Sequence, residues 1–389
     1  MPTSAAPQPW CSIVPDYLMR RLASADEPTV VAAAERSLRA DVAMRARREQ
    51  QDRIIGRLPG IVPQGLRDRA RDASTPPRAQ QVPTSPDTEP PTARRSLYDA
   101  EHRTSLPGRL VRSEGEPATE DISVTEAYDG LGATWGLLIE SYGRDSLDGA
   151  GLPLTATVHY DKDYDNAFWD GTQMVFGDGD GVYFDSFTSS IDVIGHELAH
   201  GLTQYTAGLV YVAQSGALNE SLSDVFGSLV KQRSLGQDAE AADWLIGEGL
   251  FTDRVNGVAL RSMKAPGTAY DDPVLGKDPQ PADMDGYVDL PHDSSNDNGG
   301  VHINSGIPNR AFYLTATALG GPAWAAAGQI WFDTLVAGGL PRDVDFTGFA
   351  KATVAAAKAR YGATGVEVAA VREAWRTVKV PLRVTHRNR

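Results

Sequence analysis

The sequence has a single cysteine, Cys11, among 389 residues. One thiol cannot form a disulfide within the chain, so the fold must depend on a packed core, to which bound metal ions can add stability. No apolar run approaches the roughly 18 residues that cross a membrane. The first residues also lack the basic start and apolar core of a secretory signal. We therefore expect no membrane association and no export by the usual route.

Basic residues are scarce relative to acidic ones. The 37 Lys and Arg against 51 Asp and Glu give a formal net charge of −14. A general nucleic-acid-binding protein would be basic, so we exclude nucleic acid as a partner and expect a soluble monomer. The chain is also longer than one core usually needs, which predicts two or three structural units.

A proline-rich stretch divides the chain into unequal parts. Residues 74–94 contain six prolines and little apolar bulk, a composition typical of a linker. The 73 residues before it are rich in Arg and Ala, and 28–55 is predicted to be helical. A unit of this length builds only a thin core by itself. We therefore expect either a segment that packs on the larger part or a partly disordered tail.

The larger part changes character near residue 190. Residues 96–190 carry Gly and Asp turns and strand patterns such as "TATVHY", whereas helical periodicity dominates afterwards. Ser190 and Gly208 are the expected start and stop of the first of these helices. The sequence thus predicts an α+β protein with a β-rich lobe (96–205) followed by a helical lobe (206–389).

The run "HELAH" on that first helix places His196 and His200 four residues apart. Residues at this spacing share one helix face, so both imidazoles can reach one metal ion. Glu197 is rotated about 100° away, which suits a carboxylate that handles a metal-bound water rather than a ligand. The pattern H-E-x-x-H is typical of zinc proteases. Two histidines on a solvated helix face are the simpler alternative.

A third zinc ligand is needed, because catalytic zinc takes three protein ligands and one open position. Glu220 and Asp224 lie four apart in "NESLSD", so Glu220 can bind the metal and Asp224 can hold a ligand histidine. The sequence does not match the other common spacing, H-E-x-x-H-x-x-G-x-x-H. Thr203 occupies the position of its glycine and Thr206 that of its third histidine. The predicted ligand set is therefore two His and one Glu.

With these residues in place, the sequence resembles the thermolysin-like neutral metalloproteases. The matching blocks occur in the family's order: "NAFWDGTQMVFGDGDG", the stretch 191–224, "RSMKAP" and "DNGGVHINSGIPNRAFY". The resemblance implies the two-lobed zincin fold with one catalytic zinc ion in the cleft. It also implies a neutral endopeptidase that cuts protein or peptide substrates before bulky hydrophobic residues.

The same resemblance implies a role for each matching residue. His196, His200 and Glu220 are the expected zinc ligands, and Glu197 the general base. His302, oriented by Asp297, and Tyr211 are expected to stabilise the oxyanion. The residues expected to bind substrate are Asn166, Ala167, Arg261, Val193 and Leu260.

Calcium is where the sequence departs from the family. Asp192, Asp243 and Glu248 match ligands of a double calcium site, but Lys231 and Leu245 occupy two other positions of that cluster. An ammonium group where divalent cations would sit predicts that the double site is lost. The sequence leaves open whether a single calcium ion binds elsewhere.

The N-terminal part resembles the short propeptide of the protealysin-like branch, in "CSIVPDYLMRRLA". The resemblance implies a zymogen with its propeptide in residues 1–73 as a partner, and processing within 74–95. Cys11 could cap the zinc as a thiolate, although a buried structural cysteine is the commoner case. The family is extracellular; without a recognisable signal, a cytoplasmic location or non-classical export stays open.

Two rival functions are considered. An inactive zinc-binding interaction protein on the same fold would be expected to lose Glu197 or His302, and both are present. An aminopeptidase of the wider zinc family would carry a G-x-M-E-N loop, and the sequence has none.

Overall fold

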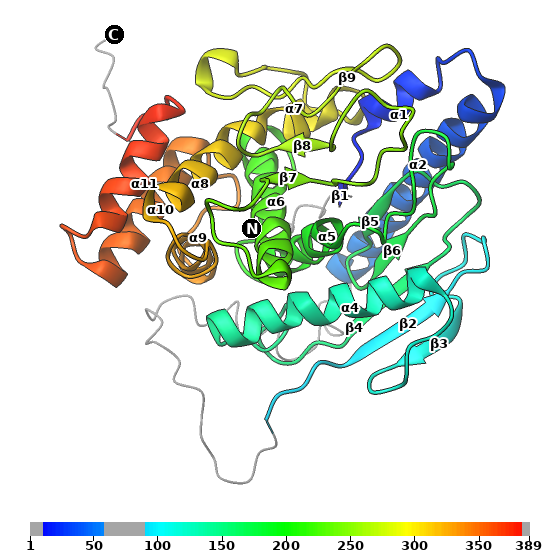
Figure 1. Ribbon diagram of the computed structural model, residues 1–389, viewed down its shortest axis with the longest axis horizontal. Helices are drawn as coiled ribbons and strands as arrows, with labels where there is room; N and C mark the ends of the chain where they lie inside the picture. The colour runs from blue at the N-terminus through cyan, green and yellow to red at the C-terminus, as the bar shows by residue number, and fades with distance from the viewer. Residues whose placement is uncertain (1–10, 58–89, 383–389) are drawn as a thin grey trace.

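The computed structural model describes residues 11–57 and 90–382. Its helices are α1 (Asp16–Leu22), α2 (Pro28–Arg57), α4 (Ile122–Gly136), α5 (Ile191–Gln204), α6 (Ala213–Leu235), α7 (Asp297–Asn304), α8 (Gly306–Leu319), α9 (Ala326–Val336), α10 (Phe346–Tyr361) and α11 (Val366–Thr377). Its strands are β1 (Cys11–Ser12), β2 (Arg95–Asp99), β3 (Arg109–Ser113), β4 (Leu154–Val158), β5 (Ala167–Trp169), β6 (Met174–Phe176), β7 (Leu245–Ile246), β8 (Arg261–Ser262), β9 (Asp271–Asp272) and β10 (Gly276–Lys277). A sheet lies on one side of α5 and α6, and α8 to α11 gather on the other (Figure 1).

The main sheet has six strands in the order β1-β5-β6-β4-β2-β3. One of its two edge strands, β1, comes from the N-terminal segment, which we define as residues 11–57. β1 pairs antiparallel with β5, with Cys11 opposite Trp169 and Ser12 opposite Phe168. The N-terminal segment therefore extends the sheet of the larger part instead of folding apart from it.

The helix α4 was not predicted, because the Gly and Asp turns of residues 96–190 suggested strands throughout. Asp121 caps this helix, since its carboxylate accepts a hydrogen bond from Val124 N at 3.2 Å. Val124, Tyr128 and Leu131 are buried at helical spacing. The β-rich lobe is thus a sheet covered by a helix.

The helices α5 and α6 form the buried centre of the molecule. They pass very close together at Gly195 and Gly227. A Cβ atom at Gly227 would lie 2.4 Å from the carbonyl oxygen of Asp192 and 3.0 Å from the backbone nitrogen of His196. Any side chain there would push the two helices apart. α5 starts after Ser190 as predicted but ends at Gln204, before the expected stop at Gly208.

Most other predicted elements are confirmed. The predicted strand "TATVHY" is β4, and the predicted helices after residue 320 are α9, α10 and α11. Trp331, Phe349 and Trp375 pack together and hold those helices on the core. Among the described residues, no helix has the length and apolar character needed to cross a membrane. Residues 74–89 of the predicted linker lie outside the described part of the chain.

Candidate metal centre and active site

His196 and His200 lie one turn apart on α5, and Glu220 faces them from α6. The two Nε2 atoms are 3.1 Å apart; Glu220 Oε2 lies 3.5 Å from that of His196, and Glu220 Oε1 lies 3.5 Å from that of His200. All three side chains are buried. Zinc bonds of 2.0–2.1 Å in a tetrahedron would place ligand atoms about 3.3 Å apart. The three residues therefore match the spacing of a zinc ligand set.

The far ring nitrogens of both histidines are held by oxygen acceptors. Asp224 Oδ1 lies 2.8 Å from Nδ1 of His196, and Asn219 Oδ1 lies 2.9 Å from Nδ1 of His200. These acceptors place the ring hydrogen on Nδ1, so the Nε2 lone pairs point toward each other. Burial lowers the pKa of His200 to about 3, which keeps the imidazole in the neutral form that metals bind.

This donor set fits a zinc ion on a further observation. Glu220 Oε2 is buried without a hydrogen-bond partner. Burial alone would raise the pKa of Glu220, but the charge of His302 holds it below its usual value. An ionised buried oxygen beside two converging lone pairs is the arrangement that a cation stabilises.

Glu197 lies beside this set and is held by the sheet. Its Oε2 accepts a hydrogen bond from the backbone nitrogen of Trp169 at 3.0 Å, whereas its Oε1 is buried without a partner. Burial, and next the charge of Glu220, raise the pKa of Glu197 well above its usual value. A carboxylate with a raised pKa and one open oxygen can accept a proton near neutral pH.

Asp224 joins the metal set to the predicted substrate-binding arginine. Arg261 donates to both oxygens of Asp224, from Nη2 at 2.8 Å and from Nε at 2.9 Å. Asn309 Nδ2 donates to Asp224 Oδ2 at 2.8 Å. Burial opposes ionisation of Asp224, but Arg261 and His196 lower its pKa below its ordinary value. Arg261 is therefore oriented by Asp224.

His302 lies on α7, after a turn that aims it at the metal set. Asp297 Oδ1 lies 2.5 Å from its Nδ1, and Asp297 Oδ2 accepts from its backbone nitrogen at 2.9 Å. Asp297 and Asn298 have φ of 53° and 48°, a left-handed conformation that these residue types tolerate. Tyr211 OH is 3.3 Å from His302 Nε2 and also donates to Glu220.

The predicted substrate-binding groups contact the N-terminal segment. Arg261 Nη1 donates to the carbonyl oxygen of Ile13 at 3.0 Å, and Ile13 N donates to the carbonyl oxygen of Ala167 at 3.2 Å. Val14 N donates to Asn166 Oδ1 at 3.0 Å, and Asn166 Nδ2 donates to Val14 O at 3.2 Å. Asn166, Ala167 and Arg261 are therefore brought together around a peptide backbone.

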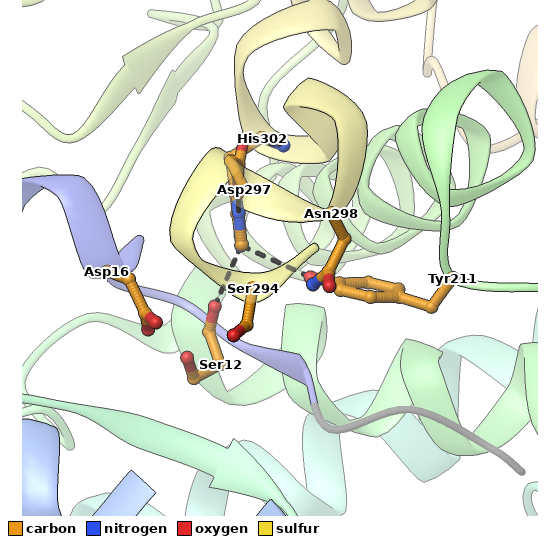
Figure 2. Close-up of a pocket in the computed structure, with 7 residues that line it drawn as sticks. All are labelled: Ser12, Asp16, Tyr211, Ser294, Asp297, Asn298 and His302. Carbon is orange, nitrogen blue, oxygen red and sulfur yellow. Dashed lines mark hydrogen bonds and ion pairs between the residues drawn. The ribbon is translucent and has the colours of Figure 1, made fainter. Parts of the chain in front are cut away.

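The N-terminal segment fills the cleft almost completely. Dashed lines in Figure 2 join His302 to Ser12 and to Tyr211, and the Ser12 carbonyl oxygen lies 3.0 Å from His302 Nε2. Only about 10 Å³ stays open there, roughly one water. This cavity is lined by Ser12, Asp16, Tyr211, Ser294, Asp297, Asn298 and His302.

The helix α2 fixes the segment from behind. Asp41 accepts from Tyr164 OH at 2.5 Å and from Asn166 Nδ2 at 3.3 Å. Arg36 pairs with Asp163 at 2.6 Å. Leu18, Met19 and Leu22 of α1 are buried in the main core. Of the two alternatives for this part of the chain, the described residues 11–44 are a packed segment.

Cys11 is buried and forms no disulfide. Its sulfur, one His200 nitrogen and one Glu220 oxygen lie within 4.8 Å of one another. Val193 and Leu260 are 0% and 3% exposed and belong to the same core as Ile13. Their role as the lining of a substrate pocket stays a prediction.

Lys231 stands among the residues matched to the calcium cluster. Its Nζ lies 2.8 Å from Asp243 Oδ2, 2.8 Å from Glu248 Oε2 and 3.6 Å from Asp192 Oδ2. Burial would lower the pKa of Lys231, but these carboxylates raise it further above its ordinary value. Leu245 lies on β7 and adds no oxygen.

Sequence comparison places this architecture in a known class. Residues 87–204 match the family description "Thermolysin metallopeptidase, catalytic domain", and residues 207–380 match "Thermolysin metallopeptidase, alpha-helical domain". The chain belongs to the thermolysin metallopeptidase family. It is a zinc metalloendopeptidase made as a zymogen.

Particular relatives narrow this to a branch. The chain is 56% identical to an extracellular metalloprotease of Pectobacterium carotovorum subsp. carotovorum over 291 residues, which is 75% of this chain and 82% of the relative. It is 53% identical to Protease PrtS of Photorhabdus sp. (strain Az29), over 75% of this chain and 78% of that one. The precursor of protealysin from Serratia proteamaculans superposes with a TM-score of 0.79 at 48% identity, covering 95% of this chain and all of that one. The chain is thus similar to the protealysin branch, as its N-terminal part predicted.

Proposed function

We propose that His196, His200 and Glu220 hold the catalytic zinc ion and that Glu197 is the general base. The observation that carries this is the buried triangle of two Nε2 atoms and the Glu220 carboxylate, with the open oxygen of Glu197 beside it. When bound there, zinc supplies a nucleophilic water at neutral pH and polarises the substrate carbonyl.

The chain's own residues do the rest of the proposed chemistry. Glu197 accepts the proton of the attacking water and passes it to the leaving amine. His302, oriented by Asp297, and Tyr211 donate to the carbonyl oxygen as negative charge develops. Removal of one such donor typically costs about 3–4 kcal/mol of transition-state stabilisation.

Substrate binding follows from the contacts of the N-terminal segment. Asn166, Ala167 and Arg261 would hold the backbone of an extended peptide as they hold residues 13–14. Val193 and Leu260 would line an apolar pocket for the residue after the cut. We propose cleavage of proteins or peptides before bulky hydrophobic residues.

The precursor is proposed to comprise a propeptide in residues 1–73 and a linker in 74–95 that is cut, with self-processing as the working hypothesis. The relatives named extracellular suggest that this enzyme also acts outside the cell. We further propose that Lys231 replaces the double calcium site, because its ammonium group sits among Asp192, Asp243 and Glu248.

The test is hydrolysis of a peptide blocked at its amino terminus. Cleavage before Leu or Phe that a zinc chelator abolishes and added zinc restores is the expected result. Cleavage only of peptides with a free amino terminus would indicate an aminopeptidase instead. The inactive alternative has no support, and absence of any hydrolysis by fully processed, zinc-loaded protein would be needed to revive it.

A further inference from the structure

The N-terminal segment does more than cover the cleft, because its backbone runs in one defined direction and register. β1 is antiparallel to β5, and the Ser12 carbonyl oxygen lies at His302, beside the metal set. A segment that only blocked the cleft could lie in either direction and at any register. The positions of the carbonyl and amide groups between residues 12 and 14 therefore indicate which peptide bond is presented to the active-site side chains.

Each backbone group at this point faces the side chain that would act on it. The Ser12 carbonyl oxygen lies 3.0 Å from Nε2 of His302, the proposed oxyanion donor. The Ile13 N–H donates to the carbonyl oxygen of Ala167 at 3.2 Å, and Trp169, two residues further along β5, donates its N–H to Glu197, the proposed proton carrier. The carbonyl of the Ser12–Ile13 bond thus meets the proposed oxyanion donor, and its nitrogen is held by the same strand that holds the proposed proton carrier.

The residues that follow complete the pattern. Arg261 holds the Ile13 carbonyl, and Asn166 holds both backbone groups of Val14. Ile13 is a bulky hydrophobic residue with a fully buried side chain. It stands where the proposed specificity requires one, directly after the aligned bond.

We infer that the Ser12–Ile13 peptide bond is itself a cleavage site of this enzyme, cut within the same molecule; this rests on the proposed roles of Glu197 and His302. One water is consumed: its oxygen bonds to the Ser12 carbonyl carbon, and the C–N bond to Ile13 breaks. Ser12 ends as a carboxylate, and the amino group of Ile13 receives the proton that Glu197 carried.

The cut divides the segment into two parts that are held very differently. N-terminal to the bond, Cys11 and Ser12 are held by the pairing of β1, by the contact of Ser12 with His302 and by the packing of Cys11 with Tyr211 and Val301. C-terminal to it, α1 and α2 are fixed by the buried Leu18, Met19 and Leu22 and by the contacts of Arg36 and Asp41. The cut therefore separates Cys11 and Ser12 from the docked part of the segment, which begins at Ile13.

The test uses the full chain loaded with zinc and followed by intact mass and N-terminal sequencing. The expected product lacks residues 1–12 and begins at Ile13, and its rate of formation does not change over a hundredfold range of protein concentration. The full chain with Glu197→Gln stays intact at this bond. Ile13→Asp slows this cut at least about tenfold, whereas Ile13→Leu retains it.

Controls separate register from folding. Val42→Asp makes the same kind of change at a position of α2 that is 62% exposed, and it leaves the cut unchanged. Hydrogen exchange in the Glu197→Gln chain reads the register without catalysis: the Ile13 and Val14 amides are protected, and Ile13→Asp exposes them. Free exchange of both amides in the parent chain would contradict the register.

A blocked reporter peptide, assayed with enzyme that has been freed of the whole N-terminal segment after linker cleavage, distinguishes the two hypotheses. If the reporter is cleaved and the Ser12–Ile13 bond stays intact in both the wild-type chain and Cys11→Ser, the inference is wrong and the proposed function stands. If the reporter is not cleaved either, the proposed function fails. Cleavage in Cys11→Ser alone supports the register and makes the Cys11 thiol the group that delays the cut.

Discussion

Two cation environments lie along the same pair of helices. At one, α5 and α6 supply His196, His200 and Glu220, whose donor atoms converge and include a buried oxygen without a hydrogen-bond partner. At the other, the same helices supply Asp192 and Lys231, and Asp243 and Glu248 close around the lysine. One environment must take its cation from solution, whereas the other has its cation built into the chain. The first can exchange and do chemistry; the second can only hold the fold together.

The largest expected effect is a loss of activity on substitution of Glu197, which lies beside the proposed zinc site. Glu197→Gln keeps the size of the side chain but removes its capacity to accept a proton, so kcat/KM should fall by about 10²- to 10⁴-fold. Zinc content should not change, because Glu197 is not a proposed ligand. Hydrolysis of a blocked peptide and metal analysis of one preparation check both statements. A loss of zinc in this variant would show that Glu197 is a ligand.

The built-in cation should control stability rather than activity. Lys231→Gln leaves Asp192 buried without its counter-charge, which should cost about 3 kcal/mol of unfolding free energy. The low end of the usual range applies because Glu248 is half exposed. Denaturant unfolding measures the cost, with the exposed Lys264→Gln as a matched control.

The effect of calcium on thermal stability provides a second test of the role of Lys231. Calcium should raise the Tm of Lys231→Gln, whose cluster then has only acidic and neutral oxygen groups, and should not change that of the parent chain. An equal calcium response in both proteins would indicate that the ion binds elsewhere.

A smaller effect is expected from the group that orients a ligand. Asn219→Ala removes the acceptor at His200 Nδ1 but leaves Ser223 Oγ, which is 3.1 Å from that nitrogen. Zinc affinity should fall by about tenfold, the low end for such partners. Competition with a chelating dye measures this, with Asn256→Ala as the exposed control. Unchanged affinity would assign the orienting role to Ser223.

The smallest expected effect is on the pH dependence of stability. It comes from His159, whose side chain loses its positive charge as the pH rises. His159 lies 2.8 Å from Asp178 and 2.9 Å from Asp121, and these carboxylates raise its pKa to about 9 against burial. The unfolded value is about 6.5, so the stabilisation is complete below roughly pH 6.5 and is lost as pH rises through 9.

After allowance for solvent screening, we expect this stabilisation to be about 1–2 kcal/mol. His159→Asn, which suits the local φ of 53°, should remove this part of the pH dependence. Unfolding free energies measured between pH 6 and 10 provide the test. Parallel curves for the two proteins would contradict it.

The metal set could be predicted because its members are close in sequence on regular helices. Helical spacing alone places His196 beside His200, and Glu220 beside Asp224. Asn219 was missed although it directly precedes Glu220, because an amide next to a ligand carries no pattern of its own. The helix α4 was missed for a different reason: glycines within it resembled turns, although Asp121 and the spacing of Val124, Tyr128 and Leu131 favoured a helix.

The contacts of the N-terminal segment could not be derived from local pattern. The Val14–Asn166 hydrogen bonds join residues 152 apart in sequence. A two-residue strand such as β1 has no periodicity to detect, and its pairing depends on an edge supplied by β5. The family resemblance indicated a short propeptide, but the residues of the segment that face His302 and Arg261 became visible only in the fold.

The pairing of β1 with β5 also bears on solubility. An exposed sheet edge can pair with other chains and start aggregation, and β5 becomes such an edge once the N-terminal segment is gone. β5 is only three residues long, and Asp170 directly after it accepts a hydrogen bond from Gln173 N in the connection to β6. A precursor can therefore be stored at high concentration with this edge covered. The processed enzyme exposes only enough edge to bind one extended peptide, which limits unwanted association between copies.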